Sequence, residues 1–528
     1  MLRGNTPSIG SFLVQLARAR MGTERWRAAK AVVLAALLFG IPLGVYLRTL
    51  APTVIWRNSG ADSGDLVTAV VTGGVPHPPG YPLYLLVATL FASLPLGEPA
   101  RSVCLISALA AAAASTLLAY AGYANMNIRG QRAQACAVSV ALTFAFAPMF
   151  WSQATIAEVY ALHVLLVTAL LAVSLSDSRC RLVIAAGVTG LGLAHHFSII
   201  LLAPTALLLL RDTFRTNRAD AGRAIGLLIA PLSLYLTLPI RAAADPPINW
   251  GNSRTLEGFW WTVSASAYHS YFFDLSSAEM FSRVAATARL LFEQFNAWGV
   301  ALALWGLAQM AANDDPQIRR RLLALGLGFL LTSAYAVAYS SRDSFLYLLP
   351  AFAIFALWMA FGLGDLASRI TRSWVQVVLA LALFFLPAYN LAVNFRNMDL
   401  SQDREAFNYA RDVFATVPRD AVILTTGGEH LFALWYYRYV IAQDASRVTV
   451  VSTELLQFDW YYDQIRKNIP TLPDTRLSTT SYSIRLRETV EWSMAAGHPV
   501  FSTTATNWLA DYAYQPVGTL YWIQSRRH

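Results

Sequence analysis

Two aspartates, a histidine and four prolines lie close together in GADSGDLVTAVVTGGVPHPPGYPLY, the segment at residues 60–84. Asp62 and Asp65 are three residues apart, so both carboxylates lie near the first turn if GDLVTAVVTGG forms a short helix. Helix capping, or a favourable interaction with the helix dipole, accounts for one of them. Beside an apolar wall, a partly desolvated carboxylate is also well placed to take a proton from a hydroxyl group.

The HPPGYP element at residues 77–82 forms a rigid turn, because its prolines and glycine restrict the backbone and leave few N–H donors. Most of this element is a structural elbow that leads into the apolar segment 81–97. His77 differs, because a rigid loop would present it to the same pocket as Asp62. Two interpretations stay open: His77 binds substrate, or it hydrogen-bonds the loop.

Polar residues also occur at the ends of later apolar runs. WSQATIAEVYALH at residues 151–163 places Glu158 at a helix end, with Tyr160 nearby. Such a glutamate is often only a dipole partner, but a carboxylate at a membrane edge is a candidate functional group. His195 and His196 are open to three interpretations: ligands, phosphate contacts or packed side chains. No HxxH or HExxH pattern accompanies them, so a metal site is less favoured.

Two arginines and a tryptophan complete the set of candidates. YLTLPIRAAADPPINWG at residues 235–251 places Arg241 at a helix end, before a loop rich in aromatic residues that includes Trp250. Arg342 lies in the turn YSSRDSF. Two arginines at the border of one cavity can hold a phosphate by bidentate hydrogen bonds. The simpler interpretation is anchoring at the membrane interface, where charged and aromatic side chains are common.

The composition indicates a polytopic α-helical membrane protein. The 528 residues are 56% hydrophobic and 13% charged, with a mean hydropathy of +0.44, and runs of about 20 apolar residues recur. Nucleic-acid binding is not favoured, because the basic residues lie in short turns between apolar runs. The three cysteines show neither CxxC nor zinc spacing, so a disulfide framework is not indicated.

Charge in the turns predicts the topology. Basic turns lie on the cytoplasmic side when segment 81–97 stays in the interface and 182–210 consists of two short helices that meet near His195 and His196. The result is about 11 transmembrane helices, with residues 1–29 as a cytoplasmic N-terminal segment and the first apolar run as a retained anchor. Further spans are predicted at 30–49, 101–124, 134–151, 157–176, 223–240, 287–311, 322–340, 345–365 and 374–394.

This topology brings the candidate residues to one side. The domain 30–395 then carries its outer loops 51–100 and 241–286 on the face opposite the basic turns. Residues 396–528 form a small α/β domain on that face, because RDAVILTT, SRVTVVS and HPVFSTT are typical of short buried strands. Its GGEH loop at 427–430 follows the first strand and is a weak binding signal.

The motifs together resemble the GT-C membrane glycosyltransferases. DSGDLVTA…GVPHPPGYPLY, FWSQATIAEVYALH, LGLAHHFS and YLTLPIR…NWG are similar to the family of the animal transmembrane protein O-mannosyltransferase for plexin-type domains and its bacterial relatives. The resemblance covers most of 30–395 and extends into the tail. This chain departs from the family pattern at GGEH, where relatives are acidic, and at Asp65, where they often have Glu.

The resemblance implies a sugar donor carried on a polyprenyl phosphate and transfer on the outer face. Asp62 would be the general base that deprotonates an acceptor hydroxyl, with inversion at the anomeric carbon. Positive charge from Arg241 or Arg342 would stabilise the departing phosphate. The other candidates are expected to bind substrate: Asp65, His77, Glu158, Tyr160, His195, His196 and Trp250.

The acceptor is a protein, a glycan or a lipid, and the superfamily leaves open whether a divalent cation assists. The competing function is a transporter or flippase of lipid-linked sugars. Transport predicts internal repeats and charge at the membrane midplane, which this sequence does not show. An Arg-rich chain with short loops fits a bacterial inner membrane, with the N-terminus cytoplasmic and the C-terminal domain periplasmic.

Overall fold

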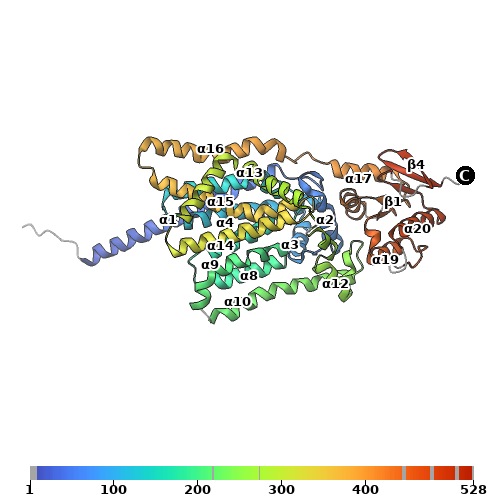
Figure 1. Cartoon of the computed structure of the whole chain (residues 1–528), viewed down its shortest axis with the longest axis horizontal. Helices are drawn as coiled ribbons and strands as arrows, with labels where there is room; N and C mark the ends of the chain where they lie inside the picture. Colours follow the sequence, from blue (N-terminus) through green and yellow to red (C-terminus); the bar gives the residue numbers. More distant parts are fainter. Residues whose placement is uncertain are drawn as a thin grey trace, which may run out of the picture.

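The computed structural model describes residues 9–216, 219–272, 274–442, 447–475, 481–505 and 511–525. Long helices run along the longest axis of the molecule, and a small α/β unit lies at one end of them (Figure 1). The helical bundle contains α1 Ile9–Arg48, α2 Ser63–Thr72, α3 Pro82–Ala92, α4 Pro99–Asn125, α5 Gln131–Ala145, α6 Pro148–Ala154, α7 Tyr160–Ser174, α8 Arg181–Leu193, α9 Ala203–Thr216, α10 Ala219–Ile229, α11 Thr237–Ala243, α12 Leu256–Val263, α13 Ser277–Ala311, α14 Pro316–Ala338, α15 Leu349–Arg369 and α16 Ser373–Met398.

Among the described residues, seven helical segments are long and apolar enough to cross a membrane, or eight if the bent pair α5 and α6 forms one span. The polytopic helical fold expected from the sequence is therefore present. Of the other predicted spans, α7 and α8 have only 15 and 13 residues, and α13 is interrupted at Asn296. A helix of about 20 residues is needed to cross the hydrocarbon core. The count of about 11 spans stays a prediction.

Segment 81–97 does not cross the membrane as one helix. Its helix α3 has 11 residues, so it is about 16 Å long, which is about half the thickness of a bilayer core. Proline at the first helical position starts it. The backbone N–H of Leu83 donates to the carbonyl of Ala194, 3.0 Å away, and so ties the start of α3 to the end of α8.

The predicted break near His195 and His196 is also present. Helix α8 ends at Leu193, and a 3-10 turn η2, Phe197–Leu202, leads into α9. The start of α8 and the end of α9 lie side by side, because Nε of Arg181 donates to Oγ1 of Thr213 at 2.6 Å. The two histidines therefore lie at the opposite end of the hairpin from the basic turn that precedes α8.

The basic turns gather at one end of the bundle. Arg129, Arg321 and Arg369 line a common cavity together with Asp177. The other end carries α2, α3, α12 and the C-terminal unit (Figure 1). The two ends thus differ in chemistry, as the distribution of charge in the sequence predicts.

The C-terminal unit is an α/β fold with a five-stranded sheet in the order β2-β1-β3-β5-β4. Its first three strands are parallel, with Val422 paired to Thr449 on one side and to Val500 on the other. The three predicted strands are present; a final hairpin was not predicted. The elements are α17 Glu405–Thr416, β1 Val422–Thr425, α18 Gly428–Tyr436, β2 Thr449–Ser452, α19 Asp459–Asn468, α20 Tyr482–Ala495, β3 Val500–Ser502, β4 Tyr512–Val517 and β5 Leu520–Ser525.

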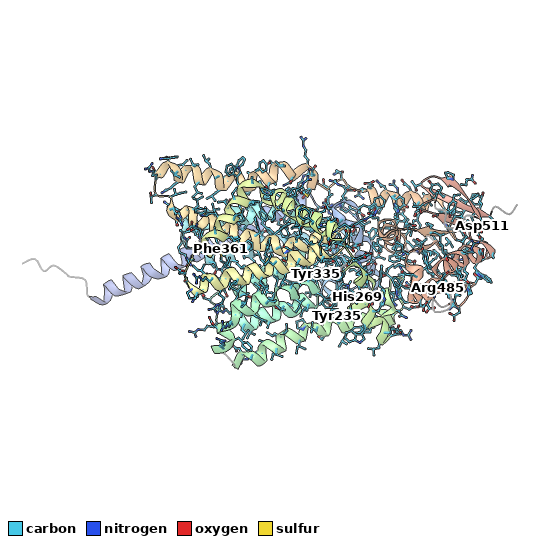
Figure 2. All side chains as sticks on the ribbon, viewed as in Figure 1. Tyr235, His269, Tyr335, Phe361, Arg485 and Asp511 are labelled. Atoms are coloured by element: carbon cyan, nitrogen blue, oxygen red, sulfur yellow. The ribbon has the colours of Figure 1, made fainter. Side chains whose placement is uncertain are left out.

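One buried arginine connects the helices of this unit. Arg485 of α20, labelled in Figure 2, is fully buried and donates to the carbonyl of Leu456 at 3.0 Å. It also pairs with Asp459 at the start of α19, and its guanidinium lies 4.6 Å from the centre of the Tyr462 ring. These contacts compensate the charge that burial would otherwise make costly.

The tightest helix contact in the bundle joins α13 and α15, and it yields a prediction. A Cβ atom added to Gly362 would lie 2.0 Å from the carbonyl oxygen of Leu302. We expect Gly362→Ala to push the helices apart and to lower stability by about 1–3 kcal/mol, the usual cost of overpacking. The measurement is a thermal melt of the purified protein, followed by tryptophan fluorescence.

Gly40→Ala in α1 is the matched control, because no atom lies within 4 Å of the added Cβ. It should melt at or slightly above the wild-type temperature, since alanine favours a helix over glycine. A Gly362→Ala protein that melts like wild type would contradict this close approach.

Candidate active site

Asp62 lies where the chain enters α2, and its carboxylate is not used as a helix cap. Neither Asp62 nor Ser63 makes a capping hydrogen bond to the start of α2; the Ser63 hydroxyl donates to the carbonyl of Gly60 at 2.6 Å. The capping interpretation of Asp62 is therefore wrong. Asn58 and Ser59 adopt left-handed conformations just before it and turn the chain sharply. The Asp62 side chain keeps 38% of its surface accessible.

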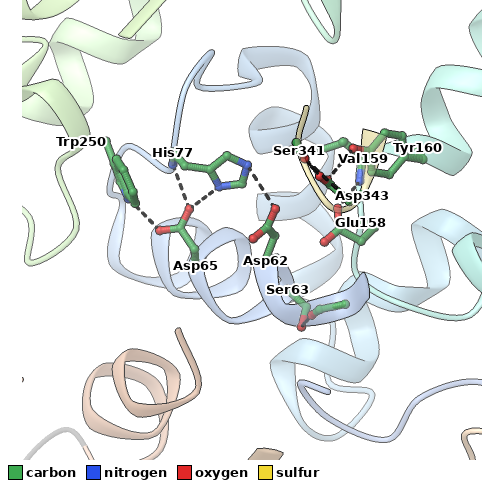
Figure 3. A network of polar contacts seen from close by, with 11 residues as sticks. Asp62, Ser63, Asp65, His77, Glu158, Val159, Tyr160, Trp250, Ser341 and Asp343 are labelled. Carbon is green, nitrogen blue, oxygen red and sulfur yellow. Dashed lines mark hydrogen bonds and ion pairs between the residues drawn. The ribbon is translucent and has the colours of Figure 1, made fainter. Parts of the chain in front are cut away.

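Asp65, one turn further along α2, is fully buried and fully engaged (Figure 3). Its Oδ2 atom accepts from the backbone N–H of His77 at 2.8 Å and from Nδ1 of the same residue at 2.7 Å. Its Oδ1 atom accepts from the indole N–H of Trp250 at 3.0 Å. Three donors thus hold one buried carboxylate, and this carboxylate fixes the imidazole ring of His77.

The other ring nitrogen of His77 points to Asp62, with 3.7 Å between Nε2 and Oδ2. Burial lowers the pKa of His77, but attraction by Asp62 and the hydrogen bond to Asp65 outweigh it and raise the pKa to about 9. Desolvation raises the pKa of Asp62 from 3.8 to about 6; attraction by His77 opposes this rise, and repulsion by Asp343 and Asp65 adds to it. Near neutral pH the pair therefore consists of a carboxylate and an imidazolium.

Glu158 lies beside this pair, in the turn between α6 and α7, and is 3% exposed. Its Oε2 atom accepts from the backbone N–H of Val159 at 3.2 Å, whereas Oε1 has no hydrogen-bond partner among the described residues. Burial and then repulsion by Asp62 raise its pKa well above the usual range. Burial thus favours the neutral form of Glu158.

Asp343 is the residue of the site that sequence reasoning missed. Its Oδ2 atom accepts from the Tyr160 hydroxyl at 3.3 Å, and its Oδ1 atom accepts from Ser341 (Figure 3). Its charge contributes to the raised pKa of Asp62. A signal was available in the sequence, because Asp343 follows Arg342 at the same helix end. A carboxylate at a membrane edge is the criterion that selected Glu158.

Arg283 of α13 holds the turn that carries Asp343. Its guanidinium donates to the carbonyls of Ala336, Val337 and Tyr339 at 2.9–3.0 Å and to the hydroxyl of Ser344. The three carbonyls lie at the end of α14, and Ser344 begins the 3-10 turn η6, Ser344–Leu348. One side chain therefore fixes both ends of the segment 339–344.

His195 and His196 lie in a cluster of histidine and tyrosine rings. Nε2 of His195 donates to the carbonyl of Val159 at 2.9 Å, which fixes its tautomer. Nδ1 of His196 accepts from the Ser198 hydroxyl at 2.8 Å, and that hydroxyl accepts in turn from Nε2 of His163 at 3.0 Å. The His196 ring lies 5.9 Å from that of Tyr160, centre to centre. His163 was not predicted.

The two predicted arginines differ. Arg241 donates to the carbonyls of Ala69 and Gly74, at 3.4 and 3.2 Å, and to the hydroxyl of Thr89 at 3.0 Å. It therefore ties the end of α2 to α3. Arg342 is exposed and makes no hydrogen bond or ion pair with the described part of the chain. The structure thus brings together Asp62, Asp65, His77, Glu158, Tyr160, Trp250, Asp343 and the histidine cluster, while Arg241 packs on the far end of α2.

The C-terminal unit covers this loop through α18. A Cβ atom added to Gly64 would lie 2.4 Å from the carbonyl oxygen of Phe432, so only glycine permits this contact. The indole N–H of Trp56 donates to the carbonyl of Glu429 at 2.9 Å. The candidate site is thus built partly from the unit at the C-terminal end.

Where the chain is described, no three His, Cys, Asp or Glu side chains are grouped so that they could hold a metal ion. The described carboxylates of the site instead contact histidine, tryptophan, tyrosine and serine.

Two family models match the chain. Residues 62–218 match the model described as the Protein O-mannosyl-transferase TMEM260 N-terminal domain, and residues 406–513 match TMEM260-associated domain 2. Together they cover about half of the 528 residues. Both models describe domains of TMEM260 proteins, so the chain is similar to this family in both segments. The first TMEM260 model begins at Asp62 and includes His77, Glu158 and both predicted histidines, whereas Trp250, Arg342 and Asp343 lie outside both models.

Similar TMEM260 proteins occur in two eukaryotes. The chain is 26% identical over 485 residues to the Protein O-mannosyl-transferase TMEM260 of Mus musculus, covering 85% of this chain and 66% of the relative. It is 22% identical over 478 residues to the tmem260 protein of Dictyostelium discoideum, covering 79% of this chain and 56% of that relative. The chain thus spans less than two thirds of the length of each relative.

Solved structures of ArnT from Cupriavidus metallidurans have the same fold. The apo structure matches with a TM-score of 0.58 at 13% identity, and the structure bound to undecaprenyl phosphate matches with a TM-score of 0.56 at 14% identity. Each match covers 94% of this chain and 98% of the ArnT chain. The GT-C-like membrane fold expected from the sequence motifs is thus confirmed.

The contacts of Asp65 predict the effect of removing its tryptophan donor. Trp250→Phe takes away the indole N–H and leaves a buried carboxylate oxygen without a donor, which costs about 1–3 kcal/mol. We expect a lower melting temperature. Trp261→Phe is the matched control, because the Trp261 indole makes no hydrogen bond within the described ranges. Equal melting of the two variants would contradict a structural role for the Trp250–Asp65 hydrogen bond.

Proposed function

We propose that this chain is an inverting glycosyltransferase that moves a sugar from a polyprenyl-phosphate donor to an acceptor hydroxyl. The observation that carries the proposal is the uncapped, partly accessible carboxylate of Asp62 beside the imidazolium of His77. The names of the relatives support mannose as the sugar and a protein as the acceptor. The ArnT structure bound to undecaprenyl phosphate supports a lipid-phosphate donor.

In this mechanism Asp62 takes the proton of the acceptor hydroxyl while the hydroxyl oxygen attacks the anomeric carbon. The bond from that carbon to the donor phosphate breaks, and the phosphate leaves with the electron pair. Attack from the side opposite the leaving group inverts the anomeric centre. A positioned base of this kind contributes roughly 10²–10⁴-fold to the rate.

The neighbours of Asp62 divide the remaining tasks. Asp65 holds His77, so that the imidazolium keeps Asp62 ionised near neutral pH. Glu158 stays protonated and can donate a hydrogen bond to a sugar hydroxyl, since its Oε1 atom has no partner in the described chain. Of the two arginines, Arg342 is the better candidate for the departing phosphate, because Arg241 is already bonded to carbonyls of α2.

The site faces the side of the membrane opposite the basic turns, and the positive-inside rule makes that the non-cytoplasmic side. Transfer would therefore follow delivery of the lipid-linked donor to the outer face. A bacterial inner membrane fits the sequence, whereas the relatives named above are eukaryotic. The mechanism is the same in either membrane.

Replacement of Asp62 tests the proposal directly. Purified wild type should transfer radiolabelled mannose from polyprenyl-phosphate mannose, and Asp62→Asn should lose at least about 100-fold in rate, because the amide cannot act as a base. Asp274→Asn is the matched control; Asp274 is an exposed residue of the outer loop 241–286 and makes no hydrogen bond or ion pair with the described part of the chain. Melting curves establish that all three proteins are folded.

Comparable transfer by Asp62→Asn and wild type would remove Asp62 as the base. Absence of transfer from every donor, together with protein-dependent movement of a donor across liposome membranes, would favour the transporter.

The shifted pKa of Asp62 predicts the pH dependence of transfer. The pKa of Asp62 is raised to about 6, so kcat/KM should fall below about pH 6 as the base becomes protonated, rather than near pH 4. Attraction by the His77 imidazolium opposes this rise in pKa. His77→Gln should therefore move the acid limb to higher pH. An acid limb near pH 4 in wild type would show that Asp62 is not desolvated as described.

A further inference from the structure

Helix α16 leaves an apolar groove at the side of the bundle. The helix α16 runs along the edge of the bundle (Figure 1) and packs mainly on α5 and α6. Between α16 and the pair α13 and α15 lies a groove of about 830 Å³. Every residue of its wall is apolar, including Trp298 and Trp305 of α13 and Leu381 and Phe385 of α16.

A smaller pocket of about 260 Å³ adjoins this groove and has three polar side chains in an otherwise apolar wall. These are Gln131, Arg132 and Gln376, and the pocket shares Leu379 and Leu383 with the groove. The only hydrogen bond found for Arg132 in the described chain is a long one, 3.4 Å, to the carbonyl of Ile370. An arginine and two amides beside an apolar groove have the form of a site for a lipid with a charged headgroup.

The length of the groove indicates which lipids reach it. Its wall follows α16 from Val378 to Leu386, nine residues that span about 13 Å at the rise of an α-helix. The hydrocarbon core of a bilayer is about 30 Å thick, so the groove matches the depth of one leaflet. The smaller pocket lies at the end of the bundle with the basic turns, which is the end opposite Asp62.

Charge complementarity favours an anionic headgroup. The turn between α15 and α16 adds Arg372 to Arg132, and Arg369 ends α15 just before it. The nearby acid, Asp365, is already bonded to Arg369 at 2.9 Å and to the indole N–H of Trp305 at 2.9 Å. The mouth of the groove therefore carries net positive charge, and basic residues at a membrane surface attract anionic lipids.

We propose that this groove is a binding site for an anionic phospholipid of the leaflet at the basic end. One acyl chain lies between α16 and the pair α13 and α15, and the phosphate binds Arg132 and the amides beside it. The site is separate from that of the sugar donor, whose phosphate must reach Asp62 at the other end. The proposal of a lipid site depends only on the membrane fold, and it holds whether or not the chain transfers sugar.

Native mass spectrometry of the full-length protein in detergent, titrated with phosphatidylglycerol or phosphatidylcholine, tests the site. Wild type should retain phosphatidylglycerol about tenfold more strongly than phosphatidylcholine. Ala382→Trp fills the groove and should weaken retention of phosphatidylglycerol at least tenfold. Arg132→Gln should reduce it to the level of phosphatidylcholine.

Two variants serve as matched controls. Ala36→Trp adds the same ring at an exposed position of α1, and Arg211→Gln removes the same charge at an exposed position of the basic end; both should bind like wild type. Melting curves establish that each variant is folded. Equal retention of the two phospholipids by wild type, or unchanged retention by Ala382→Trp, would overturn the proposal. Displacement of phosphatidylglycerol by stoichiometric polyprenyl phosphate would assign the groove to the donor instead.

Discussion

The buried carboxylate of Asp65 is the constraint on which the candidate site depends. An ionised group without exposure must be fully paired, because the cost of desolvation is otherwise too high. Its donors come from the rigid HPPGYP turn and from Trp250, which lies 185 residues further along the chain. Pairing therefore fixes the His77 ring, and the ring in turn faces Asp62. A glutamate here would reach further, so the same donors would have to move.

Three carboxyl groups within one site have different environments, and this difference separates their roles. Asp65 accepts from three N–H groups, Asp62 faces an imidazolium and solvent, and Glu158 is enclosed with one oxygen that has no partner among the described residues. Neighbouring acids whose pKa values are pushed apart can act as base and as proton donor at the same pH. The charge of Asp343 acts on both of the shifted acids, because it raises the pKa of Asp62 and that of Glu158.

Much of this arrangement follows from local sequence. The proximity of Asp62 and His77, the break at His195, the short segment after Tyr81 and the first three strands of the C-terminal sheet all depend on residues close in the chain. Asp343 was missed because its position depends on Arg283, which binds a turn more than 50 residues away. Arg241 was an ambiguous signal, since a guanidinium at a helix end can bind carbonyls as well as a phosphate. The hairpin β4–β5 lacks the apolar run that marks a buried strand, because its residues are partly exposed.

The contact between Gly64 and Phe432 has a consequence for how the protein is made. The loop with the carboxylates leaves the ribosome early, whereas the helix that covers it is synthesised more than 360 residues later. Asp65 lacks Trp250 for about the first half of that interval, and the surface of α2 lacks α18 throughout it. The membrane helices can insert in order, but the loop with Asp62 and Asp65 can reach its final packing only after α18 has been synthesised. A chain that terminates before α18 would therefore carry every residue of the carboxylate cluster and still present an unfinished surface to quality-control proteases.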